Sequence, residues 1–403
     1  MLKLLALLFV LCSLSTFAKV SFVAFGDGGY HYDYLKQKIV DNPINKEEFI
    51  LEEYESWLSK NFPENEFKVQ PMYTLPGTEH VVEASGAQPV ADAMTEYCQT
   101  NGCDFAVMLG DNIYPNGASG DIEEDRIRFQ KVLVDPYLKL AQIQQDFKMY
   151  AALGNHDWKT SRIGRDRQLE FGSQMTTAFT MKAPGYYSFT KGDVEFFVID
   201  TNLLLAGTVV KENELNPDGS EKKVCENDEP EQWELPNNED KTQLDWLESS
   251  LKTSSAKWKI VYGHHTLWSA GGSKYEQARS LRQLLMPMMC KYSDLYIAGH
   301  EHELEINIDT CAKELGTASK PLPFVVSGAA AWQRSVHHPF QSYQELNYPQ
   351  YKALWSKGMV WGFSYITIEG DKLEVQMLTT PNDGQGIPVL EKRMSFSHRS
   401  QLR

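Results

Sequence analysis

The chain lacks a surplus of positive charge. Its 39 lysine and arginine residues are outnumbered by 54 aspartate and glutamate residues, which gives a formal net charge of −15. The sequence therefore gives no sign of a basic surface that could bind a nucleic-acid backbone, and we expect no nucleic-acid partner. The same negative charge disfavours polyanionic substrates unless bound cations neutralise it locally.

Long apolar runs are also scarce, and the one at the N-terminus is short. Met1–Lys3 supplies a positive start, Leu4–Cys12 an apolar stretch, and Ala18 a small residue at the end. This pattern is typical of a secretory signal peptide over residues 1–18 and is too short for a comfortable membrane span. We expect a secreted or periplasmic protein with no stable membrane anchor. A lysosomal location stays open, and an uncleaved N-terminal anchor is the alternative.

Cysteine pairs of the kind that hold zinc are absent, because no Cys-x-x-Cys occurs. In an exported chain, some of the five cysteines beyond residue 18 should form disulfides. Cys98 with Cys103 and Cys290 with Cys311 are plausible pairs, which leaves Cys225 over. Spacing alone does not choose among the possible arrangements.

Low-complexity linkers and internal repeats are lacking too, so we predict a single domain over residues 19–403. Two segments interrupt it. Residues 31–85 hold a helical stretch around Lys46–Leu58 and several prolines, and they form either a lid near the site or a surface insertion. Residues 205–240 are polar and acidic, which indicates a long loop.

The sequence is rich in short β-branched or aromatic runs that end in polar residues. Such runs predict buried strands, and in open α/β sheets functional groups gather just beyond the strand ends. These side chains should therefore meet at one rim of a sheet. The runs end at Gly26–Asp27, Gly110–Asp111, Gly154–Asn155, Ile199–Asp200, Gly263–His264, Gly299–His300 and Ser327–Gly328.

Between these runs, apolar periodicity predicts helices over 88–100, 121–145, 243–251 and 277–291. Tyr186–Phe189 and Val194–Val198 predict a hairpin that turns at Lys191–Asp193. Near the C-terminus, 362–368 and 373–377 alternate as two further strands around a turn at 369–371.

Seven side chains at or near these strand ends are of metal-ligand type. They are two carboxylates, an amide, a phenol and three imidazoles: Asp27, Asp111, Asn155, Tyr114, His264, His300 and His302. Seven ligands suit two metal ions that share one bridging carboxylate. Mixed oxygen and nitrogen donors favour iron, manganese or zinc over calcium or magnesium. Two such ions can clamp the attacking and leaving oxygens of an in-line displacement.

The motifs and their order resemble the purple acid phosphatases, a group of calcineurin-like metallophosphoesterases, and most closely the small tartrate-resistant type. The resemblance implies an α+β fold, a four-layer α/β/β/α sandwich with two mixed β-sheets. It covers about residues 20–30 and 88–380 and leaves out 31–85 and 205–240. The motifs that carry it are Gly26–Gly28, Gly110–Tyr114, Gly154–Asp157, Val261–His264 and Gly299–His302.

The resemblance also implies a ligand set for each ion. Asp27, Asp111, Tyr114 and His302 would hold Fe(III). Asp111, Asn155, His264 and His300 would hold a divalent iron, zinc or manganese ion, so that Asp111 bridges the two. The phenol of Tyr114 on ferric iron would colour the protein purple or pink.

The implied activity is that of an acid phosphatase, in which a metal-bound hydroxide attacks a small phosphate monoester. His156 would stabilise the transition state or protonate the leaving oxygen. His265, where the related type commonly has an aromatic residue, either contacts phosphate or has a packing role, and Asp157 would orient a ligand or the backbone. The alternatives are a phosphodiesterase or nucleotidase with the same site, or an inactive binding scaffold. The sequence does not indicate an oligomeric state.

Overall fold

The computed structural model describes residues 19–60, 62–174, 177–205, 238–271, 274–317 and 319–399. The expected signal peptide, Cys225 and most of the loop predicted over 205–240 lie outside these residues. None of the helices in the described ranges is both long and apolar enough to cross a membrane.

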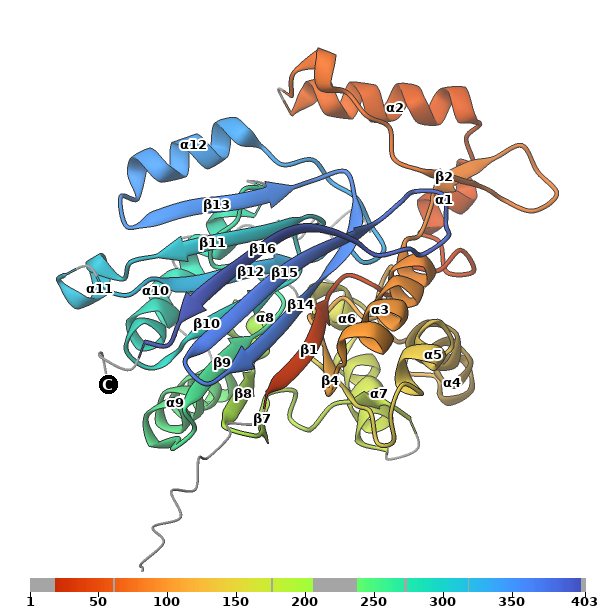
Figure 1. Cartoon of the computed structure of the whole chain (residues 1–403). Coiled ribbons are helices and arrows are strands. Elements are labelled where there is room, and N and C mark those ends of the chain that lie inside the picture. Colours follow the sequence, from red (N-terminus) through yellow and green to blue (C-terminus); the bar gives the residue numbers. More distant parts are fainter. Residues whose placement is uncertain are drawn as a thin grey trace, which may run out of the picture.

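Two seven-stranded sheets form the centre of the molecule (Figure 1). In the first sheet the strand order is β16–β15–β14–β1–β4–β5–β6, and in the second it is β13–β11–β12–β10–β9–β8–β7. Both sheets are mixed, because β1, β4, β5 and β6 run parallel, as do β8, β9, β10 and β12, while the flanking strands are antiparallel.

The strands of the first sheet are β1 (Val20–Phe25), β4 (Phe105–Met108), β5 (Met149–Ala151), β6 (Phe179–Thr180), β14 (Trp361–Glu369), β15 (Lys372–Thr380) and β16 (Val389–Ser397). Those of the second are β7 (Tyr187–Lys191), β8 (Val194–Val198), β9 (Trp258–Tyr262), β10 (Leu295–Ala298), β11 (Leu304–Asp309), β12 (Leu322–Ser327) and β13 (Tyr351–Lys357).

Aromatic side chains fill the space between the two sheets. Phe22 of β1 stacks on Phe105 of β4 at 5.0 Å between ring centroids, and Phe196 of β8 meets Phe22 edge-on at 5.3 Å. Successive residues of a strand point to opposite faces, so Phe22 enters this inner core while Val23 packs on the outer side. Burial of this apolar surface holds the sheets together.

Helices cover the outer face of each sheet, which completes four layers. The outer core of the first sheet includes residues of α3 (Ala87–Asn101) and α7 (Arg162–Ser173), and that of the second includes residues of α9 (Asn238–Thr253) and α10 (Tyr275–Tyr292). The predicted α/β/β/α sandwich with two mixed sheets is confirmed. Shorter helices are α6 (Asn155–Trp158), α8 (Thr201–Leu204), α11 (Ala312–Leu315) and α12 (His338–Asn347).

The helices predicted over 88–100, 243–251 and 277–291 are confirmed, as are the hairpin and both tail strands. The single helix predicted over 121–145 is wrong. The chain forms α4 (Ile122–Phe129), a π-helical turn, a 3-10 turn over Asp135–Tyr137, and α5 (Leu138–Ala141). Pro136 contributes to the break, since it lacks an N–H and lies in the first turn of the 3-10 helix, where no helical hydrogen bond from that position is needed.

Residues 31–85 add no described strand to either large sheet. They form α1 (Gln37–Asp41), α2 (Lys46–Ser59) and a separate hairpin, β2 (Met72–Thr74) with β3 (Val81–Glu83). The helix predicted around Lys46–Leu58 is therefore confirmed, and a reciprocal capping box between Asn45 and Glu48 starts it. Figure 1 shows α2 set apart from the sheets. The domain boundaries stay a prediction.

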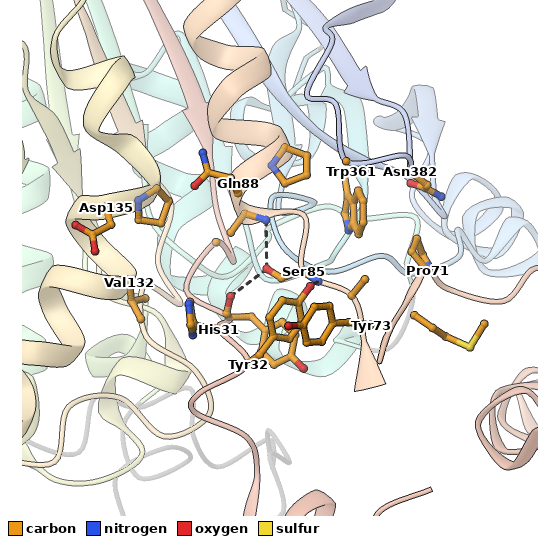
Figure 2. Close-up of a pocket in the computed structure, with 18 of the residues that line it drawn as sticks. His31, Tyr32, Pro71, Tyr73, Ser85, Gln88, Val132, Asp135, Trp361 and Asn382 are labelled. Atoms are coloured by element: carbon orange, nitrogen blue, oxygen red, sulfur yellow. Dashed lines mark hydrogen bonds between the residues drawn. The ribbon is translucent and has the colours of Figure 1, made fainter. Parts of the chain in front are cut away.

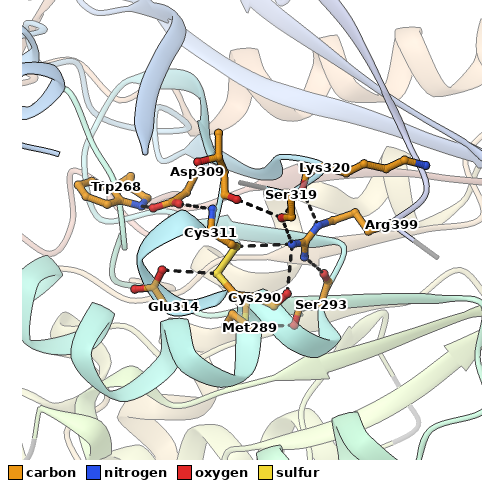
Figure 3. The surroundings of a disulfide bond; sticks show 11 residues. Trp268, Met289, Cys290, Ser293, Asp309, Cys311, Glu314, Ser319, Lys320 and Arg399 are labelled. Atoms are coloured by element: carbon orange, nitrogen blue, oxygen red, sulfur yellow. Dashed lines mark hydrogen bonds between the residues drawn. A yellow bond between two sulfur atoms is a disulfide. The ribbon is translucent and has the colours of Figure 1, made fainter. Parts of the chain in front are cut away.

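Two disulfides stabilise the outer layers, and both pairings considered from the sequence are present. Cys98 of α3 bonds to Cys103, which follows that helix. Cys290 of α10 bonds to Cys311, which precedes α11. Arg399 lies beside the second bond and donates to the carbonyl oxygens of Ser293 at 2.6 Å and Cys290 at 3.1 Å (Figure 3). The C-terminal segment thus ties the end of α10 to the disulfide.

We predict that the second disulfide contributes more to stability than the first. Its two cysteines are 21 positions apart in the sequence, whereas those of the first disulfide are 5 apart, so it closes the longer loop. The chain-entropy model then gives losses of about 3 kcal/mol for Cys290→Ala/Cys311→Ala and about 2 kcal/mol for Cys98→Ala/Cys103→Ala. Denaturant unfolding of both double variants measures this order, and a reversed order would contradict it.

Candidate metal centre

The seven candidate ligands meet at one edge of the sandwich. Asp27 follows β1, Asp111 follows β4 and Asn155 follows β5 in the first sheet, while His264 follows β9 and His300 follows β10 in the second. Within each sheet these strands are parallel neighbours, so their carboxyl ends point the same way. The tertiary structure thus brings together residues spread over most of the chain.

Tyr114 joins the first group of ligands. Its hydroxyl lies 3.0 Å from Asp27 Oδ1, 2.8 Å from Asp111 Oδ2 and 3.4 Å from His302 Nε2. His302 Nε2 is also 3.4 Å from Asp27 Oδ1. These four residues, Asp111 included, are the set that the resemblance to the purple acid phosphatases assigns to the ferric ion.

The second group surrounds His264. Its Nε2 lies 2.9 Å from His300 Nδ1, 3.0 Å from Asn155 Oδ1 and 3.4 Å from Asp111 Oδ1. The two oxygens of Asp111 therefore face different groups, Oδ2 toward Tyr114 and Oδ1 toward His264. This is the arrangement that a bridging carboxylate needs.

The tautomers of the two imidazoles show why a cation fits the second group. His264 Nδ1 is 2.8 Å from the carbonyl oxygen of Leu109, and His300 Nε2 is 2.8 Å from the amide oxygen of Gln277. Both partners are acceptors, so these two nitrogens carry the protons and the other two carry lone pairs. The lone pairs, the amide oxygen of Asn155 and Asp111 Oδ1 then face one another as four acceptors. A bound metal ion would satisfy all four.

Electrostatics in the absence of a metal agree with this fit. Burial raises the pKa of Asp27, and the charge of Asp111 raises it further. Burial is also the largest cause that lowers the pKa of His300 and His302, which favours their neutral, metal-binding form. For Asp111 burial opposes ionisation, but the neighbouring His264 and His156, together with hydrogen bonds from the backbone N–H of His156 and from Tyr114, lower its pKa overall.

Three ligand residues hold a left-handed backbone conformation. The φ angles are +60° at Asp27, +52° at Asp111 and +69° at His300. Residues other than glycine rarely adopt this region, and such strain concentrates where the surrounding structure must aim a side chain. The strand ends are thus bent to turn these three side chains into the cluster.

Asp157 supports the loops, as the sequence suggested. Its carboxylate accepts hydrogen bonds from the backbone N–H groups of Asn112 at 3.2 Å, Ile113 at 3.1 Å and Gly154 at 2.7 Å. It therefore ties the loop after β4 to the loop after β5. These are the loops that carry Asp111 and Asn155.

His156 lies next to the cluster. Its Nδ1 hydrogen-bonds to the carbonyl oxygen of Pro115, and its Nε2 faces Asp111 Oδ2 at 3.9 Å and the ammonium of Lys159 at 3.1 Å. Burial lowers the pKa of His156 to about 4, Asp111 opposes this, and Lys159 adds to it. A proton on Nε2 therefore needs further negative charge nearby, which a phosphate would supply.

His265 lies behind the cluster. It is fully buried, its ring centroid is 4.3 Å from that of His300, and its Nδ1 is 2.7 Å from the hydroxyl of Thr201. Nε2 has no hydrogen-bond partner among the described residues. The packing alternative fits these contacts, and a catalytic role for His265 stays a prediction.

Sequence reasoning missed several residues that shape the site. Gln277 of α10 hydrogen-bonds to His300. The sequence feature that could have revealed it is a polar residue on the apolar face of a helix, one turn before the buried Leu281. Lys159 lies just after the Gly154–Asp157 motif. Trp332 and Arg334 follow the end of β12 and line the pocket.

A cavity of about 390 Å³ opens onto the cluster at Tyr114, His156 and His302. A second cavity, of about 670 Å³, lies near the start of α3, where Tyr32 stacks on Tyr73 and Ser85 accepts a hydrogen bond from Ala87 N (Figure 2). None of the seven candidate ligands lines it. Of these two cavities in the described part of the chain, the smaller one reaches the candidate metal centre.

Relatives with curated names support the resemblance to purple acid phosphatases. The chain is 29% identical over 235 residues to purple acid phosphatase 4 of Arabidopsis thaliana, covering 57% of this chain and 59% of that protein. It is 25% identical over 292 residues to tartrate-resistant acid phosphatase type 5 of Rattus norvegicus, covering 69% and 75%. The chain thus spans about three fifths of the length of the plant relative.

A solved structure shows the same fold. A purple acid phosphatase from yellow lupin (Lupinus luteus) seeds superposes with a TM-score of 0.56 at 14% identity, covering 96% of this chain and 55% of that chain. In addition, the family model described as calcineurin-like phosphoesterase matches residues 80–304, which is more than half of the chain. The chain therefore belongs to the calcineurin-like phosphoesterase family.

Proposed function

We propose that this protein is an exported acid phosphatase that hydrolyses phosphate monoesters at a dinuclear centre of Fe(III) and a divalent iron, zinc or manganese ion. The observation that carries the proposal is the convergence of two ligand groups on the two oxygens of Asp111. The phenol of Tyr114 in the first group supports ferric iron there. The N-terminal sequence pattern and the two disulfides support export.

Each ion would be held by one of the two groups. Asp27, Tyr114 and His302 would bind the first, Asn155, His264 and His300 the second, and Asp111 would bridge them. Bound there, the ions would acidify a water molecule into a nucleophile available below neutral pH and neutralise the charge of the phosphate. Gln277 and Leu109 would fix the two histidine tautomers.

His156 would assist the leaving oxygen. Because Nδ1 is hydrogen-bonded to the carbonyl oxygen of Pro115, Nε2 is the ring nitrogen that faces the cluster and the cavity. A proton on Nε2 can then be transferred to the departing alkoxide. Lys159 beside Nε2 would add a positive charge toward the phosphate. Binding of the phosphate dianion would raise the pKa of His156 and so keep the proton in place.

The pH–rate profile of the mature protein tests the proposal directly. We expect fast turnover of para-nitrophenyl phosphate with a maximum below neutral pH, because the acidified nucleophile is already ionised there. The matching diester, bis-para-nitrophenyl phosphate, should be hydrolysed far more slowly. Activity confined to the diester, or an alkaline maximum, would instead favour the phosphodiesterase alternative, and no hydrolysis by the metal-loaded protein would favour an inactive binding scaffold.

We predict that Asp111→Asn abolishes assembly of the centre. The variant removes the shared negative charge, so metal content should fall from two ions per chain to one or none, and kcat should fall by about a thousandfold or more. Elemental analysis of the purified protein measures the metal content apart from activity. Asp193→Asn, an exposed residue in the β7–β8 turn, serves as the control. Full metal content in the Asp111 variant would refute the bridging role.

The role of His156 predicts a dependence on the leaving group. His156→Asn should lower kcat on glycerol phosphate by about a hundredfold or more, because an alkoxide needs a proton to depart. Nitrophenolate departs without one, so the loss on para-nitrophenyl phosphate should be clearly smaller. His338→Asn is the matched control. Equal losses on both substrates would indicate that His156 only binds the phosphate.

A further inference from the structure

The cavity over the metal centre has one wall that comes from residues 31–85. Lys36, Ile39, Phe49, Glu52 and Glu53 of this segment line it, together with Tyr114, His156, His302, Trp332 and Arg334 of the core. The insertion is therefore part of the active-site pocket. The sequence left open whether this segment is a lid near the site or a surface insertion remote from it, and the second interpretation does not fit this position.

Contacts with the loop after β12 hold the wall in place. Glu83 at the end of β3 accepts from Arg334 at 3.0 Å, and the ring of His337 lies 3.3 Å from the carbonyl oxygen of Lys60 just after α2. Ser85 donates to the carbonyl oxygen of Tyr30 at 3.0 Å. The segment is thus fastened at both ends, and its position relative to the metal centre is set.

The part of the pocket next to the metal centre is aromatic. Trp332 stacks on Tyr30 at 4.1 Å between centroids, and its ring is 5.5 Å from that of Tyr114 and 6.1 Å from that of His302. Ile39, Ile44, Phe49, Val81 and Val82 add apolar surface to the same cavity. A volume of about 390 Å³ lies at the small end of the range for ligand sites, so it suits a compact, flat group.

Charge is distributed unevenly along the pocket. At the metal end, Lys159 lies against His156, and the charge of Lys36 acts on the same imidazole. On the insertion side, α1 presents Lys38, and α2 presents Glu52 and Glu53. Burial raises the pKa of Glu83, Arg334 opposes the rise and Glu53 adds to it, which places the charge of Glu53 close to the Glu83–Arg334 pair. Positive charge thus acts where the phosphate would bind, and on the insertion side the two carboxylates of α2 outnumber the single ammonium of Lys38.

We infer that the wall formed by residues 36–83 selects the leaving group: it accepts compact aromatic phosphate monoesters that are uncharged or positively charged beyond the phosphate, and Glu52 and Glu53 reject those that carry a second negative charge. This inference rests on the proposed monoesterase function. It goes further by assigning a specificity role to a segment outside the motifs of the metal centre. Nucleoside polyphosphates are among the substrates it excludes.

Three aryl phosphates that differ mainly in charge test the inference. They are phenyl phosphate, para-aminomethylphenyl phosphate and para-carboxyphenyl phosphate. We expect kcat/KM to decrease in the order cationic, neutral, anionic. In Glu52→Gln/Glu53→Gln the ratio of cationic to anionic kcat/KM should fall about tenfold, and added salt should reduce the ratio in the parent protein. Comparing ratios between proteins cancels the intrinsic reactivity of each ester.

Glu47→Gln/Glu55→Gln is the matched control, because it removes the same charge from exposed positions of the same helix that do not line the cavity. This control should keep the ratio of the parent protein. An equal ratio in all three proteins, or an equal fall in both double variants, would overturn the inference.

Binding of non-hydrolysable phosphonates separates failure of the inference from failure of the proposed function. Calorimetry with para-aminomethylbenzylphosphonate and para-carboxybenzylphosphonate should show the same preference in Kd, and the same loss in Glu52→Gln/Glu53→Gln. Selective binding without hydrolysis of any monoester would refute the proposed activity and leave the charge selection standing. Hydrolysis of all three esters without charge preference in rate or binding would overturn only the inference.

Discussion

The carboxylate of Asp111 is the constraint on which the rest of the site depends. It can face both ligand groups only because the ends of β4 and β5 approach each other closely. A Cβ on Gly154 would lie 2.1 Å from the backbone nitrogen of Asp111, so glycine is required there. The second sheet meets the same point, since Leu109 O accepts from His264 Nδ1. Two sheets and the loops after β4, β5 and β9 are thus brought to one side chain.

The fold separates the chemistry of the site from its selectivity. Strand ends with strained backbone hold the candidate ligands, and the hydrogen bonds of Asp157 fix the loops after β4 and β5 relative to each other. The wall beside it comes from α2 and the β2–β3 hairpin, which contact the loop after β12 through Glu83 with Arg334 and Lys60 with His337. Such a segment can change its surface charge without disturbing the metal centre, which suits a specificity element.

Much of the site was predictable because its signals are local. A buried strand followed by Gly-Asp, Gly-Asn-His or Gly-His is readable without a structure. The resemblance to the purple acid phosphatases that these motifs carry implied both the sandwich and the ligand sets. The helix expected over 121–145 failed because Pro136 interrupts a pattern whose apolar residues do not all turn inward; Ile127 is 51% exposed and Leu138 is 43% exposed. Periodicity alone does not say which apolar residues reach the core.

The sequence by itself determined the identities of the donor atoms and the strands that deliver them, because both follow from residue types in short stretches. Only the tertiary structure decided which oxygen of Asp111 faces which group, and that Gln277 orients His300 while His265 packs behind it. It also decided that residues 31–85 wall the pocket, with Glu52 and Glu53 facing into it. These features arise from contacts between residues far apart in the chain, and the geometry of such contacts is set by how the layers pack.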